Sequence, residues 1–279
     1  MVECPPPVPP LQGVSFMTML SRRALLAGLA VTPLLPSLAA AQAKSELLIY
    51  CGITMVKPIK DIAVLMESRH GVKVTVSQGG SEDLYEALKL SKVGDIYFPG
   101  SSSYRQQHLA EGLLGDAVPV GYNVAALFVA KGNPKKVGAD IKELLRPDLS
   151  MVVCNPETGS IGAETKKILD RAGLTAPVLA RSVFLATDSR SLVQAMKAQQ
   201  ADLTLNWRAT GFFPENRDIV DIIDLDPSVS QPAKLELNLL TFSKQAQAAR
   251  LFADLAASSE GQAIFRKHGF LDAAMRGDY

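Results

Sequence analysis

Residues 47–81, LLIYCGITMVKPIKDIAVLMESRHGVKVTVSQGGS, contain two short apolar runs with an amphipathic stretch between them. The runs Leu47–Cys51 and Val72–Ser77 have the composition of buried strands, and Lys57–Ser68 has helical periodicity with Pro58 near its first turn. A strand, a helix and a second strand in this order predict a mostly parallel sheet with helices on both faces.

The same alternation continues toward the C-terminus and starts again after residue 150. We expect helices at 82–90, 104–111, 141–145, 163–172, 192–198, 245–256 and 260–267, and extended runs at 95–98, 124–129, 151–154, 183–186, 203–206 and 235–242. Two α/β lobes follow from this pattern. Because an extended run and two helices come last, the chain is expected to return to its first lobe.

The predicted domains are lobe 1, residues 44–122 plus 237–279, and lobe 2, residues 123–236. The chain would then cross between the lobes near Gly121–Val124 and Ala233–Leu237. A ligand is expected between the lobes, beyond the carboxyl ends of the strands, because binding crevices of open α/β sheets lie there.

The first 43 residues have the pattern of a bacterial export signal. Arg22 and Arg23 precede the apolar run Ala24–Val31, and residues 41–43 read AQA, which a signal peptidase accepts. The paired arginines favour the twin-arginine type over a general secretory signal. Two prolines interrupt the apolar segment, which is too short to span a membrane. We expect an exported, periplasmic protein.

Charge is balanced, with 29 Lys and Arg against 28 Asp and Glu in the whole chain. No run of like charges gives the footprint of a protein that binds nucleic acid or an anionic membrane. The predicted mature chain keeps Cys51 and Cys154, and both lie in apolar strand-like runs. We expect buried free thiols, although an oxidising compartment would permit a disulfide.

Hydroxyl groups stand at the junctions between predicted strands and helices in both lobes. Thr54 and Ser81 occupy two junctions of the first lobe, and residues 158–162, TGSIG, and 188–191, DSRS, occupy two of the second. A helix N-terminus has unpaired N–H groups and about half a positive charge. Any one of these residues could be a plain helix cap, but their recurrence in both lobes indicates an anion site.

Trp207 and Arg208 follow the predicted strand at 203–206 and combine the sole tryptophan with a cation. We expect both at the cleft because the carboxyl end of that strand should face it. The alternative is structural: Trp207 packs under a lobe and Arg208 forms a surface ion pair.

Several segments resemble periplasmic molybdate-binding proteins of ABC importers. They are 47–54, LLIYCGIT; 76–81, VSQGGS; 94–97, GDIY; 155–162, NPETGSIG; 201–205, ADLTL, ahead of Trp207; and 259–270, SEGQAIFRKHGF. The resemblance implies a two-lobe class II periplasmic-binding-protein fold that closes on a tetrahedral oxyanion and delivers it to a membrane permease.

By this resemblance the ligand-binding positions fall at Thr54, Ser81, Ile161, Ser189 and Trp207, and the residues themselves add Ser160 and Arg208. In this chain Trp207 replaces a phenolic donor, and Arg208 adds a charge where the family has a small residue. The predicted protein is a monomer with no catalytic residues and no cofactor. The alternatives are another small anion, a ferric ion, whose sites use clustered tyrosines, or an enzyme, for which no catalytic motif is present.

Overall fold

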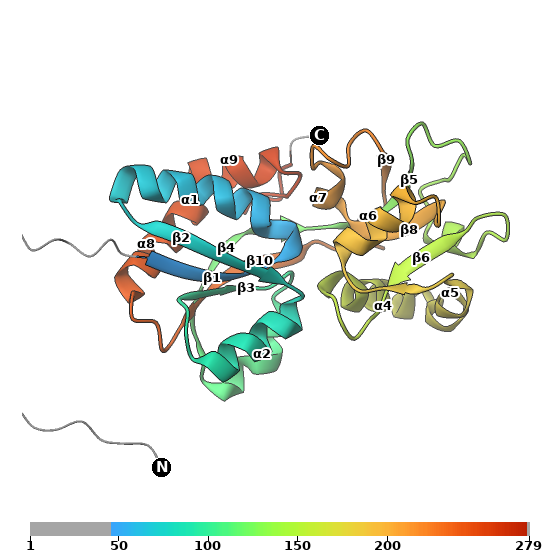
Figure 1. The fold of residues 1–279 in the computed structure, drawn as a ribbon. Coiled ribbons are helices and arrows are strands. Elements are labelled where there is room, and N and C mark those ends of the chain that lie inside the picture. Colours follow the sequence, from blue (N-terminus) through green and yellow to red (C-terminus); the bar gives the residue numbers. More distant parts are fainter. Residues whose placement is uncertain (1–45, 278–279) are drawn as a thin grey trace, which may run out of the picture. The chain divides into compact units, whose positions relative to one another are not determined.

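The computed structural model describes residues 46–277, and these form two mixed sheets with helices packed against them (Figure 1). The predicted export signal lies outside the described residues. Among residues 46–277 no helix has both the length and the apolar composition that crossing a membrane would require.

The first sheet has the strand order β2-β1-β3-β10-β4. Its strands are β1 (Glu46–Gly52), β2 (Lys73–Gly79), β3 (Ile96–Phe98), β4 (Leu114–Asn123) and β10 (Ala233–Leu240). β1 pairs in parallel with β2 and β3, whereas β10 runs antiparallel to β3 and β4. The associated helices are α1 (Val56–His70), α2 (Ser81–Ser91), α3 (Ser103–His108), α8 (Ala246–Ala257) and α9 (Ser259–Lys267), with 3-10 turns η1 (Ile53–Met55) and η2 (Leu109–Glu111). We call these elements the first lobe.

The second sheet has the strand order β7-β6-β8-β5-β9. Its strands are β5 (Ala125–Ala130), β6 (Met151–Cys154), β7 (Leu185–Ala186), β8 (Leu203–Trp207) and β9 (Val220–Asp224). The helices that belong to it are α4 (Ser160–Ala172), α5 (Thr175–Arg181), α6 (Ser189–Lys197) and α7 (Arg208–Gly211), with a 3-10 turn η3 (Ile141–Leu145). These elements make up the second lobe.

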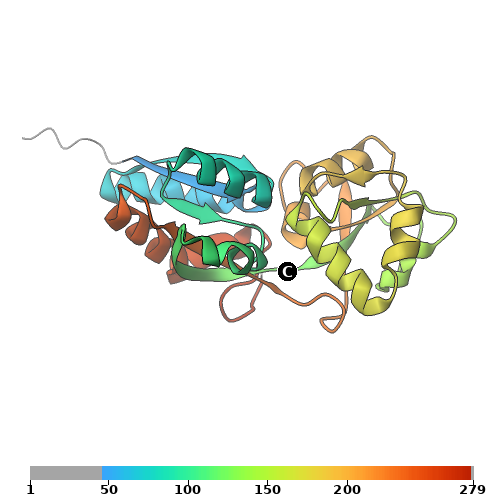
Figure 2. The ribbon, with the colours of Figure 1, turned by 90° about the horizontal axis from the view of Figure 1, so that it is seen from below.

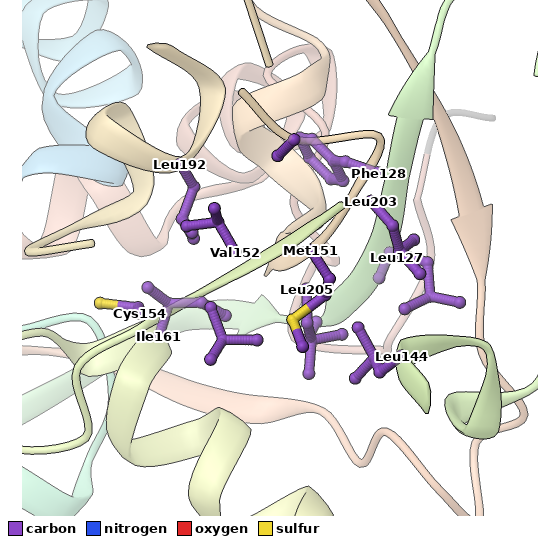
Figure 3. Packing of buried hydrophobic residues seen from close by; sticks show 14 of the residues in the cluster. Leu127, Phe128, Leu144, Met151, Val152, Cys154, Ile161, Leu192, Leu203 and Leu205 are labelled. Carbon is purple, nitrogen blue, oxygen red and sulfur yellow. The ribbon is translucent and has the colours of Figure 1, made fainter. Parts of the chain in front are cut away.

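Each sheet has its own hydrophobic core. In the first lobe Ile59 of α1 and Phe252 of α8 pack on one face of the sheet, and Leu84 of α2 packs in a separate cluster on the other. The second lobe buries Phe128, Leu203 and their neighbours in one cluster (Figure 3). Two cores of this kind allow the lobes to be stable as separate bodies.

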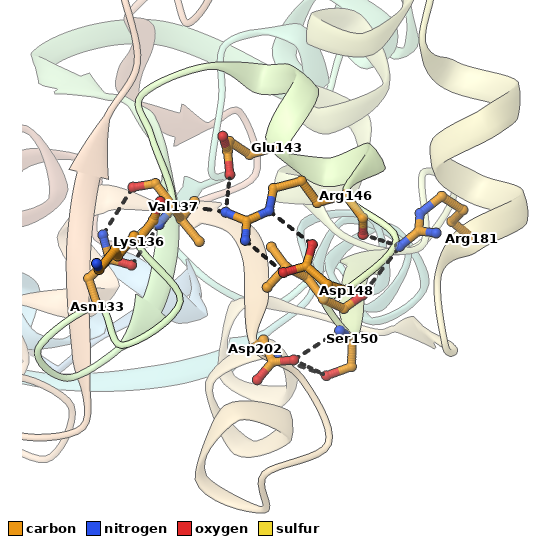
Figure 4. Close-up of polar contacts among 10 residues, drawn as sticks. Asn133, Lys136, Val137, Glu143, Arg146, Asp148, Ser150, Arg181 and Asp202 are labelled. Atoms are coloured by element: carbon orange, nitrogen blue, oxygen red, sulfur yellow. Dashed lines mark hydrogen bonds and ion pairs between the residues drawn. The ribbon is translucent and has the colours of Figure 1, made fainter.

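Polar contacts fasten the loops at one end of the second lobe (Figure 4). Arg146 pairs with both Glu143 and Asp148, and Arg181 of α5 donates to the carbonyl oxygen of Arg146. At the start of β6, the Asp202 carboxylate accepts hydrogen bonds from the backbone N–H and the hydroxyl of Ser150. These contacts hold the loops around β6 in place.

The chain passes between the sheets at two adjacent segments (Figure 2). β4 ends at Asn123 and β5 begins at Ala125, so Val124 makes the first crossing. The second crossing lies within residues 225–232, because β9 ends at Asp224 and β10 begins at Ala233, opposite Asn123 in β4. The chain thus re-enters the first sheet at Ala233, earlier than the predicted residue 237. The predicted limits of the two lobes as domains stay a prediction.

Most predicted elements are present, with ends shifted by a few residues. The helix expected at 141–145 is a 3-10 turn, and the strand expected at 183–186 shrinks to Leu185–Ala186. Four strands and α-helices were missed, β4, α5, α7 and β9, together with the 3-10 turn η1. β4 contains Pro119 and Gly121, which argue against a strand, but it lies at the edge of its sheet, where proline is tolerated.

Cys51 and Cys154 are buried free thiols, as predicted. Burial raises the pKa of the Cys51 thiol well above its ordinary range and raises the pKa of Cys154 to about 12. Both side chains are therefore protonated, unreactive core residues at neutral pH.

Candidate functional site

A cavity of about 20 Å³ lies where the carboxyl ends of strands from both lobes meet helix N-termini. Its volume is close to the roughly 10–15 Å³ that one ordered water needs and far below the roughly 300 Å³ or more of pockets for drug-sized molecules. It has room for a group of a few atoms only. The residues that line it are Gly52, Ile53, Thr54, Met55, Gly79, Gly80, Ser81, Gly100, Gly159, Ser160, Ile161, Asp188 and Ser189.

In the first lobe Ser81 is the first residue of α2 and follows the N-cap residue Gly80, which has no side chain to cap the helix. The Ser81 hydroxyl oxygen accepts a hydrogen bond from the Gly100 backbone N–H at 3.0 Å, and the Tyr97 hydroxyl donates to the Ser81 carbonyl at 2.8 Å. Thr54 lies in η1, directly after β1, and its hydroxyl has no hydrogen-bond partner among residues 46–277.

In the second lobe Ser160 opens α4 after Gly159, again without a side-chain cap. The Ser160 hydroxyl oxygen accepts a hydrogen bond from Trp207 Nε1 at 3.0 Å. Ser189 opens α6, and the Asn206 side-chain amide donates to its carbonyl at 3.0 Å. Two side chains of β8 therefore hold the helix starts: Trp207 bonds the first residue of α4, and Asn206 bonds the first residue of α6.

Close packing across the cavity requires glycine at position 100. A Cβ atom there would overlap the Ser160 hydroxyl oxygen, while the Gly100 N–H already holds Ser81. Gly100 therefore lies between Ser81 of the first lobe and Ser160 of the second, and a side chain would force the two serines apart.

The cavity favours negative charge without a countercharge. Its lining includes no Lys or Arg among the described residues, but α2, α4 and α6 all begin at it. The first turns of these helices have unsatisfied N–H groups and partial positive charge, which together attract an anion. The one carboxylate of the lining, Asp188, accepts the Ser191 N–H at 2.8 Å and so caps its own helix.

Five of the seven sequence-predicted site residues line this cavity: Thr54, Ser81, Ser160, Ile161 and Ser189. Trp207 is fully buried behind it and reaches it only through Ser160. Arg208 does not line it. Its Nε donates to Asp224 Oδ1 at 2.8 Å, and its guanidinium lies 4.6 Å from the centre of the Phe212 ring.

The position of Arg208 corrects the expectation that it faces the cleft. Its backbone N–H donates to the Val124 carbonyl at 2.8 Å, where the chain first crosses between the sheets. This bond turns the start of α7 toward the crossing segments, and the side chain follows toward Asp224 at the end of β9. Arg208 forms an ion pair, as the structural alternative expected, but its side chain is buried and only its partner Asp224 lies at the surface.

Gly100 and Gly52 of the lining were not predicted from the sequence, whereas Gly159 lies within the predicted junction at residues 158–162. Gly100 follows β3 and precedes a run of three serines, which reads as an ordinary loop. The available signal was its place just beyond Pro99, which follows the buried strand β3. What it contacts depends on the second lobe and is not a local property of the sequence.

A larger cavity of about 300 Å³ shares Ile53 with the small one and has a cationic lining. Lys60, Arg190 and Lys197 line it, and Lys57 lines it in an ion pair with Glu215. Such a concentration of positive charge in a protein of balanced overall charge attracts anions toward this side of the site.

Comparisons with known proteins concern the family and the fold of the chain. The family model described as "Bacterial extracellular solute-binding protein" matches residues 47–271. The molybdate-binding protein ModA of Rhodobacter capsulatus is 23% identical over 257 residues, covering 88% of this chain and 96% of that protein.

Two solved structures show the same fold. The sulfate-binding protein SubI of Mycobacterium tuberculosis superposes with a TM-score of 0.74 at 14% identity, covering 82% of this chain and 87% of that one. The Azotobacter vinelandii periplasmic molybdate-binding protein gives a TM-score of 0.67 at 16% identity, covering 81% and 98%. The sequence-based prediction of a two-lobe class II binding-protein fold is thereby confirmed.

Proposed function

The chain belongs to the family of bacterial extracellular solute-binding proteins, and we propose that it is the periplasmic component of an ABC importer that binds one small tetrahedral oxyanion between its lobes. Molybdate and tungstate are the proposed ligands. Its relatives support this class, since ModA of Rhodobacter capsulatus is a molybdate-binding protein and SubI, which has the same fold, is a sulfate-binding protein.

The observation that carries the proposal is the meeting of three helix N-termini and four hydroxyl groups at one cavity of about 20 Å³. Every polar side chain of the lining except the capping carboxylate of Asp188 has a hydroxyl that can donate a hydrogen bond. Hydrogen bonds to a charged acceptor stabilise a complex by about 1.5–3 kcal/mol each, so several donors can hold an ion without a cationic side chain.

The alternatives have less support in the lining. Ferric sites with clustered tyrosines are not favoured, because none of the described residues that line the cavity is a tyrosine. The lining likewise has no histidine among the described residues that could act as a general base. A small anion other than molybdate remains compatible with the same donors.

Delivery to a permease requires that the site open and close. The separate cores of the two lobes and the adjacent crossings at Val124 and 225–232 favour closure of rigid bodies about these segments. We propose that the monomer closes on the anion and presents the closed form to a permease of the inner membrane.

The test is a thermal-melting screen of the purified protein against molybdate, tungstate, sulfate, phosphate and small carboxylates. A ligand that binds only the folded state raises the free energy of unfolding by about 2.7 kcal/mol when its concentration is 100 times its Kd. We expect molybdate or tungstate to raise the Tm most. A rise in Tm with a carboxylate or another organic ligand and with none of the oxyanions would overturn the proposal.

A further inference from the structure

An ion pair joins α1 of the first lobe to the turn that follows α7 in the second lobe. Lys57 lies in the first turn of α1, and its Nζ is 2.5 Å from Oε2 of Glu215. The same Nζ lies 4.6 Å from the centre of the Phe213 ring. One ammonium group of the first lobe thus contacts a carboxylate and an aromatic face of the second, and both of these attract a cation.

The turn that carries Glu215 is fastened to the second sheet. The carbonyl of Asn216 accepts a hydrogen bond from the Ile219 N–H at 2.9 Å. The carbonyl of Ile219 accepts one from the N–H of Lys131, the residue directly after β5, also at 2.9 Å. α1 packs in the core of the first lobe instead. The ion pair therefore exists only while the two lobes are together.

The pair is charged but open to solvent. The Lys57 side chain is 30% exposed and that of Glu215 is 53% exposed. Partial burial alone would raise the pKa of Glu215, but hydrogen bonds from Lys57 and from its own backbone N–H outweigh this and lower that pKa below its ordinary value. Glu215 is therefore ionised at neutral pH, and added salt should weaken its attraction to Lys57.

The ion pair lies beside the proposed anion site. Lys57, Phe213 and Glu215 all line the larger cavity of about 300 Å³, which shares Ile53 with the cavity of about 20 Å³. Because residues of both lobes line the small cavity, a group bound in it leaves when the lobes part. Parting of the lobes separates Lys57 from both of its partners.

We propose that Lys57, Phe213 and Glu215 form a latch between the lobes, which stabilises the closed form and slows release of the bound anion. This inference rests on the proposed function. A contact made only in the closed form shifts the equilibrium toward that form whether or not a ligand is present. Because the contact must break before the lobes part, its loss should raise the rate of release more than it lowers the rate of binding.

The first experiment measures the dissociation rate constant of molybdate by stopped flow in the wild type, Lys57→Gln, Glu215→Gln and the double variant. We expect about a fivefold rise for Lys57→Gln, which removes both contacts, and about a threefold rise for Glu215→Gln, which removes one. The double variant should match Lys57→Gln, because Glu215 has no latch partner once Lys57 is replaced.

Lys166→Gln is the matched control. Lys166 forms an equally short ion pair with Asp170, at 2.5 Å, but both residues lie in α4 of the second lobe. Its replacement should leave the dissociation rate constant unchanged. Added salt should bring the wild-type rate closer to that of Lys57→Gln, because salt screens the exposed pair.

The second experiment tests the contact without an anion. A carbodiimide joins an amine and a carboxylate that touch, forming an amide with loss of water. Digestion and mass spectrometry should detect an amide between Lys57 and Glu215 in the wild type, and molybdate should raise its yield. The ion pair of Lys131 with Asp221, at 2.7 Å within the second lobe, is the positive control.

An amide between Lys131 and Asp221 without one between Lys57 and Glu215, with or without molybdate, would overturn the latch and leave the proposed function intact. Equal release rates for the wild type and Lys57→Gln would do the same. If the wild type binds none of the screened oxyanions, the proposed function and the effect on release fail together. The cross-link alone then shows whether Lys57 and Glu215 join the lobes.

Discussion

Arg208 Nε lies 2.8 Å from Asp224 Oδ1, and this ion pair joins the start of α7 to the end of β9. Both residues lie beside the segments where the chain crosses between the lobes, because Arg208 also bonds Val124 through its backbone and residues 225–232 follow Asp224. The Arg208 side chain is 7% exposed and that of Asp224 is 51% exposed. We therefore expect Arg208 to stabilise the crossing region and not to contact the proposed anion.

Arg208→Ala should lower the free energy of unfolding by about 1–2 kcal/mol, less than for a fully buried pair because solvent screens Asp224. The molybdate Kd should change by less than about threefold, since the cavity lining stays intact. Denaturant unfolding and calorimetry measure the two quantities. Lys131→Ala, which removes an exposed ion pair with Asp221, is the control and should cost no more than about 0.5 kcal/mol. An unchanged free energy of unfolding together with a tenfold loss of molybdate affinity would show that Arg208 binds the anion.

Ser81→Ala should weaken molybdate binding by about tenfold or more, because one donor to the anion is lost. Stability should fall as well, by about 1 kcal/mol, since the Gly100 N–H loses its acceptor. Ser68→Ala is the matched control: Ser68 is exposed, and its hydroxyl donates to the Leu65 carbonyl of its own helix. Equal molybdate Kd values for Ser81→Ala and Ser68→Ala would show that the Ser81 hydroxyl does not bind the anion.

The cationic cavity beside the site should govern the rate of anion binding. Replacing Lys60 and Lys197 by glutamine should lower the association rate constant at low salt by about threefold or more and leave the dissociation rate constant nearly unchanged. Added salt should reduce the difference, because it screens exposed charges. Stopped-flow measurements with Lys135→Gln, on an exposed loop elsewhere in the second lobe, provide the comparison. An effect on dissociation alone would contradict this account.

How much of the site can be predicted from sequence depends on whether a feature is local. Ser81 and Ser160 were found because each follows a strand and glycine and opens a helix, which is a pattern within a few residues. Gly100 was missed because its importance comes from Ser160, which is distant in sequence. Arg208 was misplaced because its direction is set by Val124 and Asp224, and adjacency to a strand end does not fix where a side chain points.

Stability should fall at alkaline pH because of the two buried thiols. Folding raises the pKa of Cys51 and Cys154, so above the ordinary thiol pKa of about 8.5 the unfolded chain loses protons that the folded chain keeps. Each protonated thiol makes its full contribution to the free energy of unfolding below about pH 8.5. Above that pH the contribution is lost, by up to about 1.4 kcal/mol per pH unit for each thiol.

Denaturant unfolding from about pH 8 to about pH 10 measures this slope. A variant with alanine at both positions should have a flatter profile over the same range. If its slope matches that of the wild type, the thiols do not cause the loss. Alkylation provides a second check, since both thiols should react in denaturant but resist the reagent in the native protein.

The most direct test of the central claim is anomalous scattering from a crystal grown with tungstate. The account predicts one strong tungsten peak in the cavity, within hydrogen-bond distance of the hydroxyl oxygens of Ser81 and Ser160, and no contact with Arg208. A tungsten peak elsewhere, with the cavity between Ser81 and Ser160 lacking it, would contradict the account.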